Sequence, residues 1–108
     1  MSATTAKSEV FNVTGGLGCQ DHAIVSRVLL KQRSGNVTLF AFDGGQELSE
    51  HTCPYEAFLH VLEGSAEVTI GGEPHSLAEH HAIVLPAGVP HAVRASEPFK
   101  MLLTIIRA

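Results

Sequence analysis

Short apolar runs separated by turn-forming residues are the feature that most constrains the fold of this chain. The runs hold about four to eight residues and are rich in Val, Ile, Leu, Thr and Phe, while helical spacing is not sustained anywhere. Gly, Pro, Asn and Asp stand between the runs, where turns need them. The pattern predicts strands at 23–31, 37–42, 56–63, 65–70, 75–77, 82–85, 91–95 and 99–106, with a further leading strand at Val10 to Val13. Strands spaced in this way are typical of a β-sandwich or β-barrel, so we expect an all-β fold.

Two local features refine this expectation. Gly71-Gly72 predicts a tight hairpin, because both central positions of a type I′ turn need positive φ. The closing stretch 101–106 is apolar nearly throughout, so alternation does not assign it one solvent-facing side. We expect it to be covered on both sides, either by loops of the same chain or by a second subunit. A homodimer is therefore the expected assembly.

Composition and charge limit the possible classes of protein. The chain has 108 residues, 44% of them hydrophobic, which suits a single domain, expected at 10–108 after a flexible segment at 1–9. The formal charge of -4 and the absence of a basic stripe argue against a nucleic-acid partner. No apolar window reaches the roughly 20 residues of a membrane helix, and the first residues lack the order of a secretory signal. We therefore expect a cytoplasmic protein whose Cys19 and Cys53 are free thiols.

Two segments combine His, Cys, Pro and Gly at short spacing. The first runs from Gly45 to Gly64, and the second, Leu85 to His91, reads Leu-Pro-Ala-Gly-Val-Pro-His. Together they resemble the two motifs of the cupins, which read Gly, five residues, His-x-His and a closing Gly, and then Pro-x-Gly, two residues and His. The resemblance covers residues 37–106, and the positions that match are Gly45, His51, Gly64, Pro86, Gly88 and His91.

The resemblance implies a double-stranded β-helix, a jelly-roll barrel that in many cupins holds a divalent metal near one mouth. The chain departs from the motif at two positions. Cys53 stands where the family has its second His, and Ala57 stands where it has Glu, Gln or a further His. Because side chains alternate along a strand, His51, Cys53 and Ala57 share a face if the strand is regular, although Pro54 can interrupt it.

The metal ligands that we expect are therefore His51, Cys53 and His91. Two imidazoles and a thiol can bind Zn, Fe(II) or Cu, with water completing the coordination shell. These metals are favoured over Mn, because the carboxylate that helps to hold hard ions is missing. No organic cofactor is implied, and no catalytic residue is assigned.

Other interpretations of the same residues stay open. Cys53 could pack as a small apolar side chain while His51 and His91 line a metal-free pocket, as hydrogen-bonding or acid–base groups. Cys53 could also act as a nucleophile, but no oxyanion-hole signal accompanies it. The expected apolar lining of the pocket is Leu59, Val61, Phe40 and Phe42.

The remaining polar residues near the motifs are expected to lie outside the site. Glu56 has the opposite strand parity to Ala57, which predicts a position at the rim, and His60 shares that parity and is expected to pack or to lie at an interface. His80-His81 predicts an exposed turn. His22 and His75 are expected at the surface.

Two hypotheses for function follow. In the first, the chain is an enzyme that uses a metal on a small organic substrate, as cupin dioxygenases and isomerases do. In the second, it is a non-catalytic module that binds or senses a small molecule at a degenerate site. The sequence holds no nucleophile elbow, P-loop or dinucleotide fingerprint, so hydrolase and nucleotide-binding functions have no support.

Overall fold

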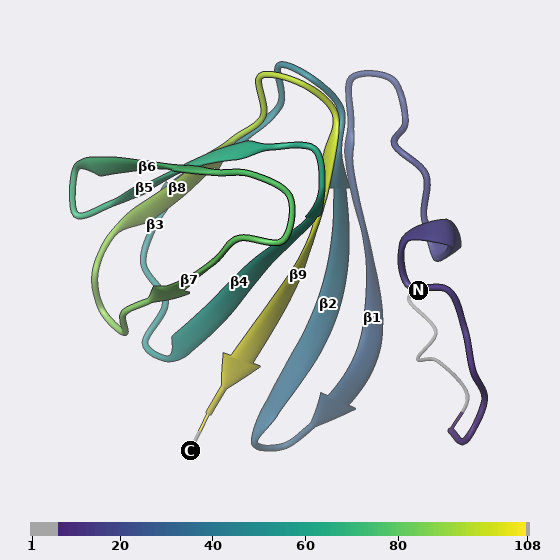
Figure 1. The fold of residues 1–108 in the computed structure, drawn as a ribbon. Helices are drawn as coiled ribbons and strands as arrows, with labels where there is room; N and C mark the ends of the chain where they lie inside the picture. Colours follow the sequence, from purple (N-terminus) through teal and green to yellow (C-terminus); the bar gives the residue numbers. More distant parts are fainter. Residues whose placement is uncertain (1–6, 108) are drawn as a thin grey trace.

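Antiparallel strands make up nearly all of the regular structure in the computed structural model, which describes residues 7–107 (Figure 1). A 3₁₀ turn, η1, occupies Thr14–Gly16. The strands are β1 (Ile24–Gln32), β2 (Gly35–Phe42), β3 (Glu47–His51), β4 (Glu56–Glu63), β5 (Ala66–Ile70), β6 (Glu73–Leu77), β7 (Ala82–Leu85), β8 (His91–Arg94) and β9 (Phe99–Ile106).

The strands form two sheets. One has the order β1-β2-β9-β4-β7 and the other the order β3-β8-β5-β6. After β2 the chain passes repeatedly from one sheet to the other, which winds the strands into a double-stranded β-helix (Figure 1). The all-β jelly-roll fold expected from the sequence is therefore confirmed.

The core lies between the inner faces of the two sheets. The Phe42 and Phe99 rings pack with their centroids 4.5 Å apart, and Leu59 and Val61 are fully buried beside them. Phe40 packs against this cluster and is half-buried. The four side chains expected to line a pocket thus point inward, but they fill the core.

Several strand predictions hold, and the Gly71-Gly72 hairpin is confirmed by φ values of 57° and 86° between the paired residues Ile70 and Glu73. One strand prediction is wrong, and one strand was not predicted. Val10 to Val13 is not a strand, because it joins no sheet. The strand β3 was not predicted, because its sequence Glu-Leu-Ser-Glu-His is polar and only Leu48 packs against the core.

The two ends of the chain differ from the expectations in different ways. Residues 1–6 lie outside the described residues, so the expected flexibility of 1–9 is not tested, and residues 7–9 are exposed. The apolar stretch 101–106 forms most of β9, in the middle of its sheet. It is not covered on both sides within this chain, because Ile106 is 58% exposed and 102–105 are half-buried. No helix among residues 7–107 is long and apolar enough to span a membrane.

Candidate metal centre

The strands β3 and β8 bring together two histidines that are forty residues apart in the sequence. His51 is the last residue of β3 and His91 is the first of β8, and the two are paired across the ladder. Their Nε2 atoms lie 3.1 Å apart, with the ring centroids separated by 4.4 Å at an interplanar angle of 67°. An irregularity in the pairing between Leu48 and His51 shifts the register just before the histidine.

Backbone carbonyls hold the other nitrogen of each ring. The Nδ1 atom of His51 lies 2.8 Å from the carbonyl oxygen of Ser49, and Nδ1 of His91 lies 3.3 Å from that of Val89. A carbonyl oxygen only accepts, so each bond requires a proton on Nδ1. A neutral imidazole with its proton on Nδ1 presents a lone pair at Nε2.

When both carbonyl bonds are made, the two Nε2 atoms are acceptors that face each other, with no positive charge between them. Two imidazole nitrogens on one Zn ion, each at roughly 2.0–2.1 Å, lie roughly 3.0–3.4 Å apart at angles of about 95–110°. The observed 3.1 Å falls in this range. The donor type and the separation of the two nitrogens thus fit a divalent metal.

Burial differs between the two rings. His91 is 6% exposed, whereas His51 is exposed to solvent. Burial lowers the pKa of His91 below its usual value of 6.5, the bond to the Val89 carbonyl opposes this shift, and the neighbouring His51 adds to it. A neutral imidazole is the form that binds metal, and the exposed side of His51 leaves the pair open to solvent.

Cys53 lies beyond the end of β3, in the loop that leads to β4. Its carbonyl oxygen accepts a 2.8 Å hydrogen bond from the Gly88 amide, which ties this loop to the loop that precedes His91. The Cys53 side chain is half-buried. Among residues 7–107 no three His, Cys, Asp or Glu side chains gather closely enough to hold a metal. The structure thus brings His51 and His91 together but does not add the Cys53 thiol as a third ready-placed ligand.

The strand-parity argument for these residues fails for a simple reason. The chain leaves one sheet after His51 and enters the other at Glu56, so the two segments are not one continuous strand. Ala57 does point inward, being 6% exposed, but it does so from the opposite sheet. Glu56 is exposed, as expected.

The remaining histidines lie outside the site. His22, His80 and His81 are exposed, as expected, and His60 is half-buried on β4. His75 differs from the surface position expected for it. It is half-buried, because it is paired with Val68 and so shares the inner face of its sheet.

The sequence interpretation missed the partners of the two rings. The carbonyls of Ser49 and Val89 each lie two residues before the histidine that they hold. A backbone carbonyl is present at every residue, so the sequence does not mark which carbonyl binds a ring. The only possible signal for these two carbonyls was their position two residues before each histidine.

The surface formed by residues 7–107 includes three hollows, and neither His51 nor His91 lines any of these three. Their volumes are about 380, 220 and 340 Å³. The smallest lies closest in sequence to the metal motif, between the Pro54 loop, Ala87 and Ile106.

The sequence profile of the cupin domain matches residues 38–106. The chain belongs to the cupin domain family. This cupin is similar to a crystal structure of a protein of unknown function from Streptococcus pyogenes, with 36% identity and a TM-score of 0.89 over 95% of this chain and 90% of that one. A cupin superfamily protein from Desulfitobacterium hafniense has 19% identity and a TM-score of 0.90 over 100% of this chain and 99% of that one, which shows the shared fold alone.

Two curated relatives come from Streptomyces. Polyketide synthase CurC of Streptomyces cyaneus is 32% identical over 66% of this cupin and 47% of its own length. An uncharacterized protein of Streptomyces coelicolor is 31% identical over 68% of this cupin and 71% of its own length. The cupin thus spans about half the length of CurC.

Proposed function

We propose that this cupin binds one divalent metal between the Nε2 atoms of His51 and His91 and that a small organic ligand binds at this metal. The observation that carries the proposal is the pair of Nε2 atoms 3.1 Å apart, each on a ring whose Nδ1 is held by a carbonyl. A metal between them leaves both carbonyl bonds intact and removes the repulsion of two lone pairs.

A shared hydrogen bond is the competing explanation for the short distance. It requires one ring to carry its proton on Nε2, and that ring then loses its bond to the backbone. His91 is the ring with the longer carbonyl contact, 3.3 Å, so it would be the donor. This metal-free pair, acting on a ligand through hydrogen bonds or proton transfer, is the second candidate function. The lack of a three-residue ligand cluster among residues 7–107 favours it.

Cys53 is the proposed third ligand of the metal site. Its loop is fastened to the loop before His91 through the Gly88 amide, so its backbone is already tied to the site. Two imidazoles and one thiolate together would favour Zn, Fe or Cu over Mn. If the Cys53 thiol does not bind the metal, the metal ligands are the two histidines and water molecules.

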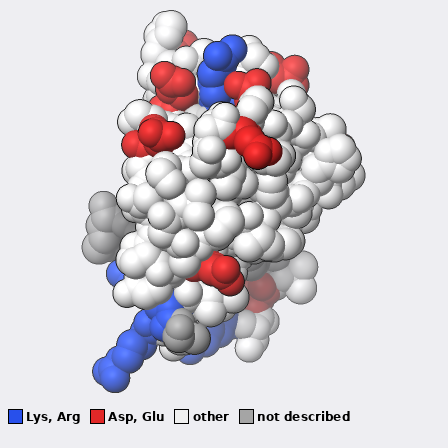
Figure 2. Space-filling model, turned by 90° about the vertical axis from the view of Figure 1, so that its left-hand side faces the viewer, with Lys and Arg blue, Asp and Glu red and all other residues white. Residues whose placement is uncertain are grey.

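Access to the site suggests the kind of ligand. The loops around the histidines lie at the side of the molecule that faces left in Figure 1, and Figure 2 shows that the middle of this side carries few charges, with Lys and Arg only toward its upper and lower edges. The middle of this side therefore offers no basic cluster to attract a phosphorylated ligand. We infer a small, weakly charged organic molecule, which is compatible with the polyketide synthase named among the relatives.

A bound metal with open positions would supply a Lewis acid for this ligand. His51 and His91 would orient that centre, and their carbonyl partners would fix the ring tautomers. Whether the ligand is converted or only held is decided by assay of the loaded protein.

Elemental analysis of untagged protein tests the proposal. After incubation with Zn and Fe(II) and removal of excess metal, the wild type should retain about one metal ion per chain. His51→Ala and His91→Ala should lose it, whereas the matched control His80→Asn, at a surface turn with φ of 72°, should keep it. Equal metal content in the control and in both site variants would contradict the proposal.

Cobalt substitution tests the role of Cys53 separately. If the thiol is a ligand, the cobalt protein should show a thiolate charge-transfer absorption that disappears in Cys53→Ser. A cobalt complex without this absorption assigns the site to the two histidines and water.

A further inference from the structure

The inner face of the four-stranded sheet carries a row of side chains that begins at the two histidines and ends at a carboxylate. Strand pairing runs from β3 through β8 and β5 to β6, and the successive partners are His51, His91, Ile70 and Glu73. Directly paired residues share a face, so these four side chains form one band, called here the inner row. Glu73 thus lies on the same face as the two histidines, two strands away from His91.

Burial along β6 supports an inward direction for Glu73. Leu77, four residues farther along the strand, is 4% exposed, and His75 between them is half-buried, whereas the residues that alternate with these three are exposed. Alternate residues of a strand point to the same side, so Glu73 points to the side of Leu77. Exposure on this side rises from Leu77 to Glu73. The inner face therefore opens to solvent at the end of the sheet where His51 is also exposed.

The hairpin that carries Glu73 is fastened to the loop before His91. The Gly71 amide donates a 2.8 Å hydrogen bond to the carbonyl of Pro90, and a Cβ on Gly71 would lie 3.4 Å from Cγ1 of Val89. Val89 is also the residue whose carbonyl holds the His91 ring. Backbone contacts thus set the position of Glu73 relative to His91. Neighbouring strands lie about 4.8 Å apart, so the two residues are about 10 Å apart across β5.

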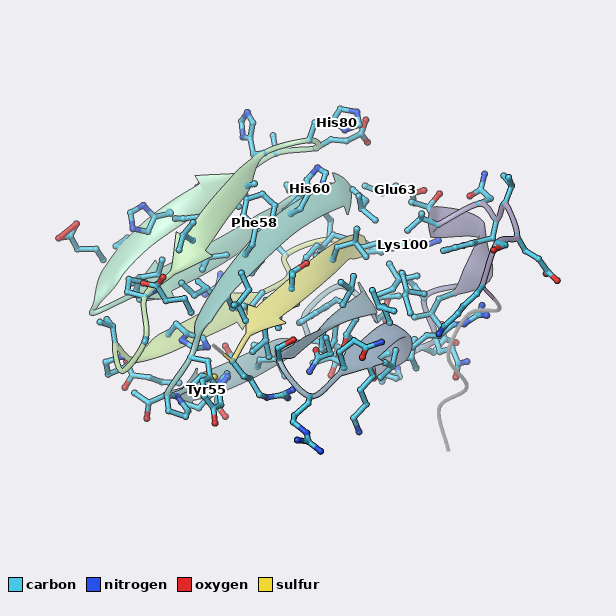
Figure 3. All side chains as sticks on the ribbon, turned by 90° about the horizontal axis from the view of Figure 1, so that it is seen from below. Tyr55, Phe58, His60, Glu63, His80 and Lys100 are labelled. Atoms are coloured by element: carbon cyan, nitrogen blue, oxygen red, sulfur yellow. The ribbon has the colours of Figure 1, made fainter. Side chains whose placement is uncertain are left out.

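The Glu73 carboxylate forms no ion pair within residues 7–107. The ion pairs there use the carboxylates of Glu63 and Glu79. Lys100, the partner of Glu63, lies with it toward one end of β4, and Tyr55 lies at the opposite end (Figure 3). The chain enters β4 from β3 at the Tyr55 end, so this lysine is remote from the candidate site. The inner row itself contains no Lys or Arg, which leaves the carboxylate of Glu73 available to a positively charged ligand.

We propose that Glu73 binds a positively charged amino group of the ligand whose other end binds the metal. This inference rests on the proposed metal site between His51 and His91. A ligand that reaches from the metal to Glu73 passes over Ile70, which is half-buried. The inner row therefore selects a molecule with a metal-binding group and an amino group about 10 Å apart, joined by an apolar chain. Opposite charges at the two ends leave such a molecule with little net charge.

The contribution of Glu73 to binding is limited by its exposure to solvent. Ion pairs between exposed groups change an equilibrium constant by up to about fivefold, and salt weakens them. Glu73 is therefore expected to set the preference among ligands that already bind the metal, and not to hold a ligand by itself.

Calorimetric titration of the zinc-loaded protein with two hydroxamic acids tests the proposal. A hydroxamate binds zinc through its oxygen atoms. The hydroxamate of ε-aminocaproic acid carries a terminal amino group, which a methyl group replaces in heptanohydroxamic acid. The wild type should prefer the amino compound, and the ratio of the two dissociation constants should change about fivefold in Glu73→Gln at low salt. The zinc content should stay that of the wild type, because Glu73 is not a proposed ligand of the metal.

Glu67→Gln is the matched control. Glu67 is exposed on β5 and is paired with Ser76 and Arg94, so it lies on the outer face of the same sheet. Its substitution removes the same charge and should leave the ratio of dissociation constants unchanged.

The zinc content, measured before the titration, separates the possible failures. If zinc is bound and the ratio is unchanged in Glu73→Gln, or changes equally in Glu67→Gln, the role of Glu73 is overturned and the metal site stands. Zinc-loaded protein that binds neither hydroxamate also overturns the role of Glu73. Protein that retains no zinc contradicts the proposed function itself, and the inference fails with it.

Discussion

A carbonyl two residues earlier in the chain holds the ring of each histidine in the candidate site. This arrangement directs both Nε2 atoms toward one point and leaves one ring buried and the other open to solvent. The cupin resemblance predicted from the sequence that His51 and His91 belong together, and the structure agrees. The position of the Cys53 thiol was not predictable from strand parity, because the strand ends at His51.

Burial of His91 makes the stability of the metal-free protein depend on pH. Its pKa is lowered in the folded state, chiefly by burial, so the unfolded chain binds a proton at that residue more readily. Lowering the pH through the unfolded value of 6.5 therefore reduces the free energy of unfolding, and the loss levels off below the folded pKa.

Urea denaturation with a chelator present, from about pH 8 to about pH 5, measures this effect. His91→Gln should show a smaller fall in stability with pH than the wild type, whereas His80→Asn should match the wild type. An identical pH dependence in wild type and His91→Gln would show that His91 is not the residue responsible.

At the scale of elements, turns and strand ends position the site. The Gly71-Gly72 hairpin was predictable, because its turn needs two positive φ angles and few residue types other than glycine adopt them. The strand β3 was not predictable from hydrophobic periodicity. It lies at the edge of its sheet and needs few apolar side chains, so Glu47 to His51 shows little alternation of apolar and polar residues. The strand that presents His51 is thus the one that hydrophobic periodicity failed to find.

Gly64, the closing glycine of the first motif, has a structural role between β4 and β5. Its φ is 77°, and a Cβ there would lie 2.5 Å from the carbonyl oxygen of Pro98 and 2.8 Å from Cβ of Phe99. Gly64→Ala should therefore lower the free energy of unfolding by about 2–4 kcal/mol, through backbone strain and overpacking together.

Gly72→Ala is the control for this prediction. Gly72 has a φ of 86°, but a Cβ added there would meet nothing within 4 Å, so only the backbone strain of about 1–2 kcal/mol remains. Urea denaturation compares the two variants. Equal destabilisation would mean that the close approach of the Pro98–Phe99 backbone does not limit the residue at position 64.

At the scale of the whole molecule, the two faces of the five-stranded sheet have different roles. The inner face packs against the other sheet to form the core. On the outer face Leu39 and Ala41 are fully buried, whereas Phe58 and Val84 are 45% and 52% exposed. From the sequence, the apolar stretch 101–106 predicted that both faces of this strand are covered. It did not indicate which face stays open, because that depends on where the N-terminal segment lies.

The double-stranded β-helix holds His51 and His91 as a pair, and we propose that the pair binds one metal. Long-range ¹H–¹⁵N correlation NMR during a zinc titration tests this most directly, because it reports the tautomer and the ligation of each ring separately. We predict that one zinc ion per chain shifts the Nε2 resonances of His51 and His91 together and leaves both rings protonated at Nδ1. Zinc that leaves either Nε2 resonance unchanged, or that shifts His80 to the same extent, would contradict metal binding by this pair.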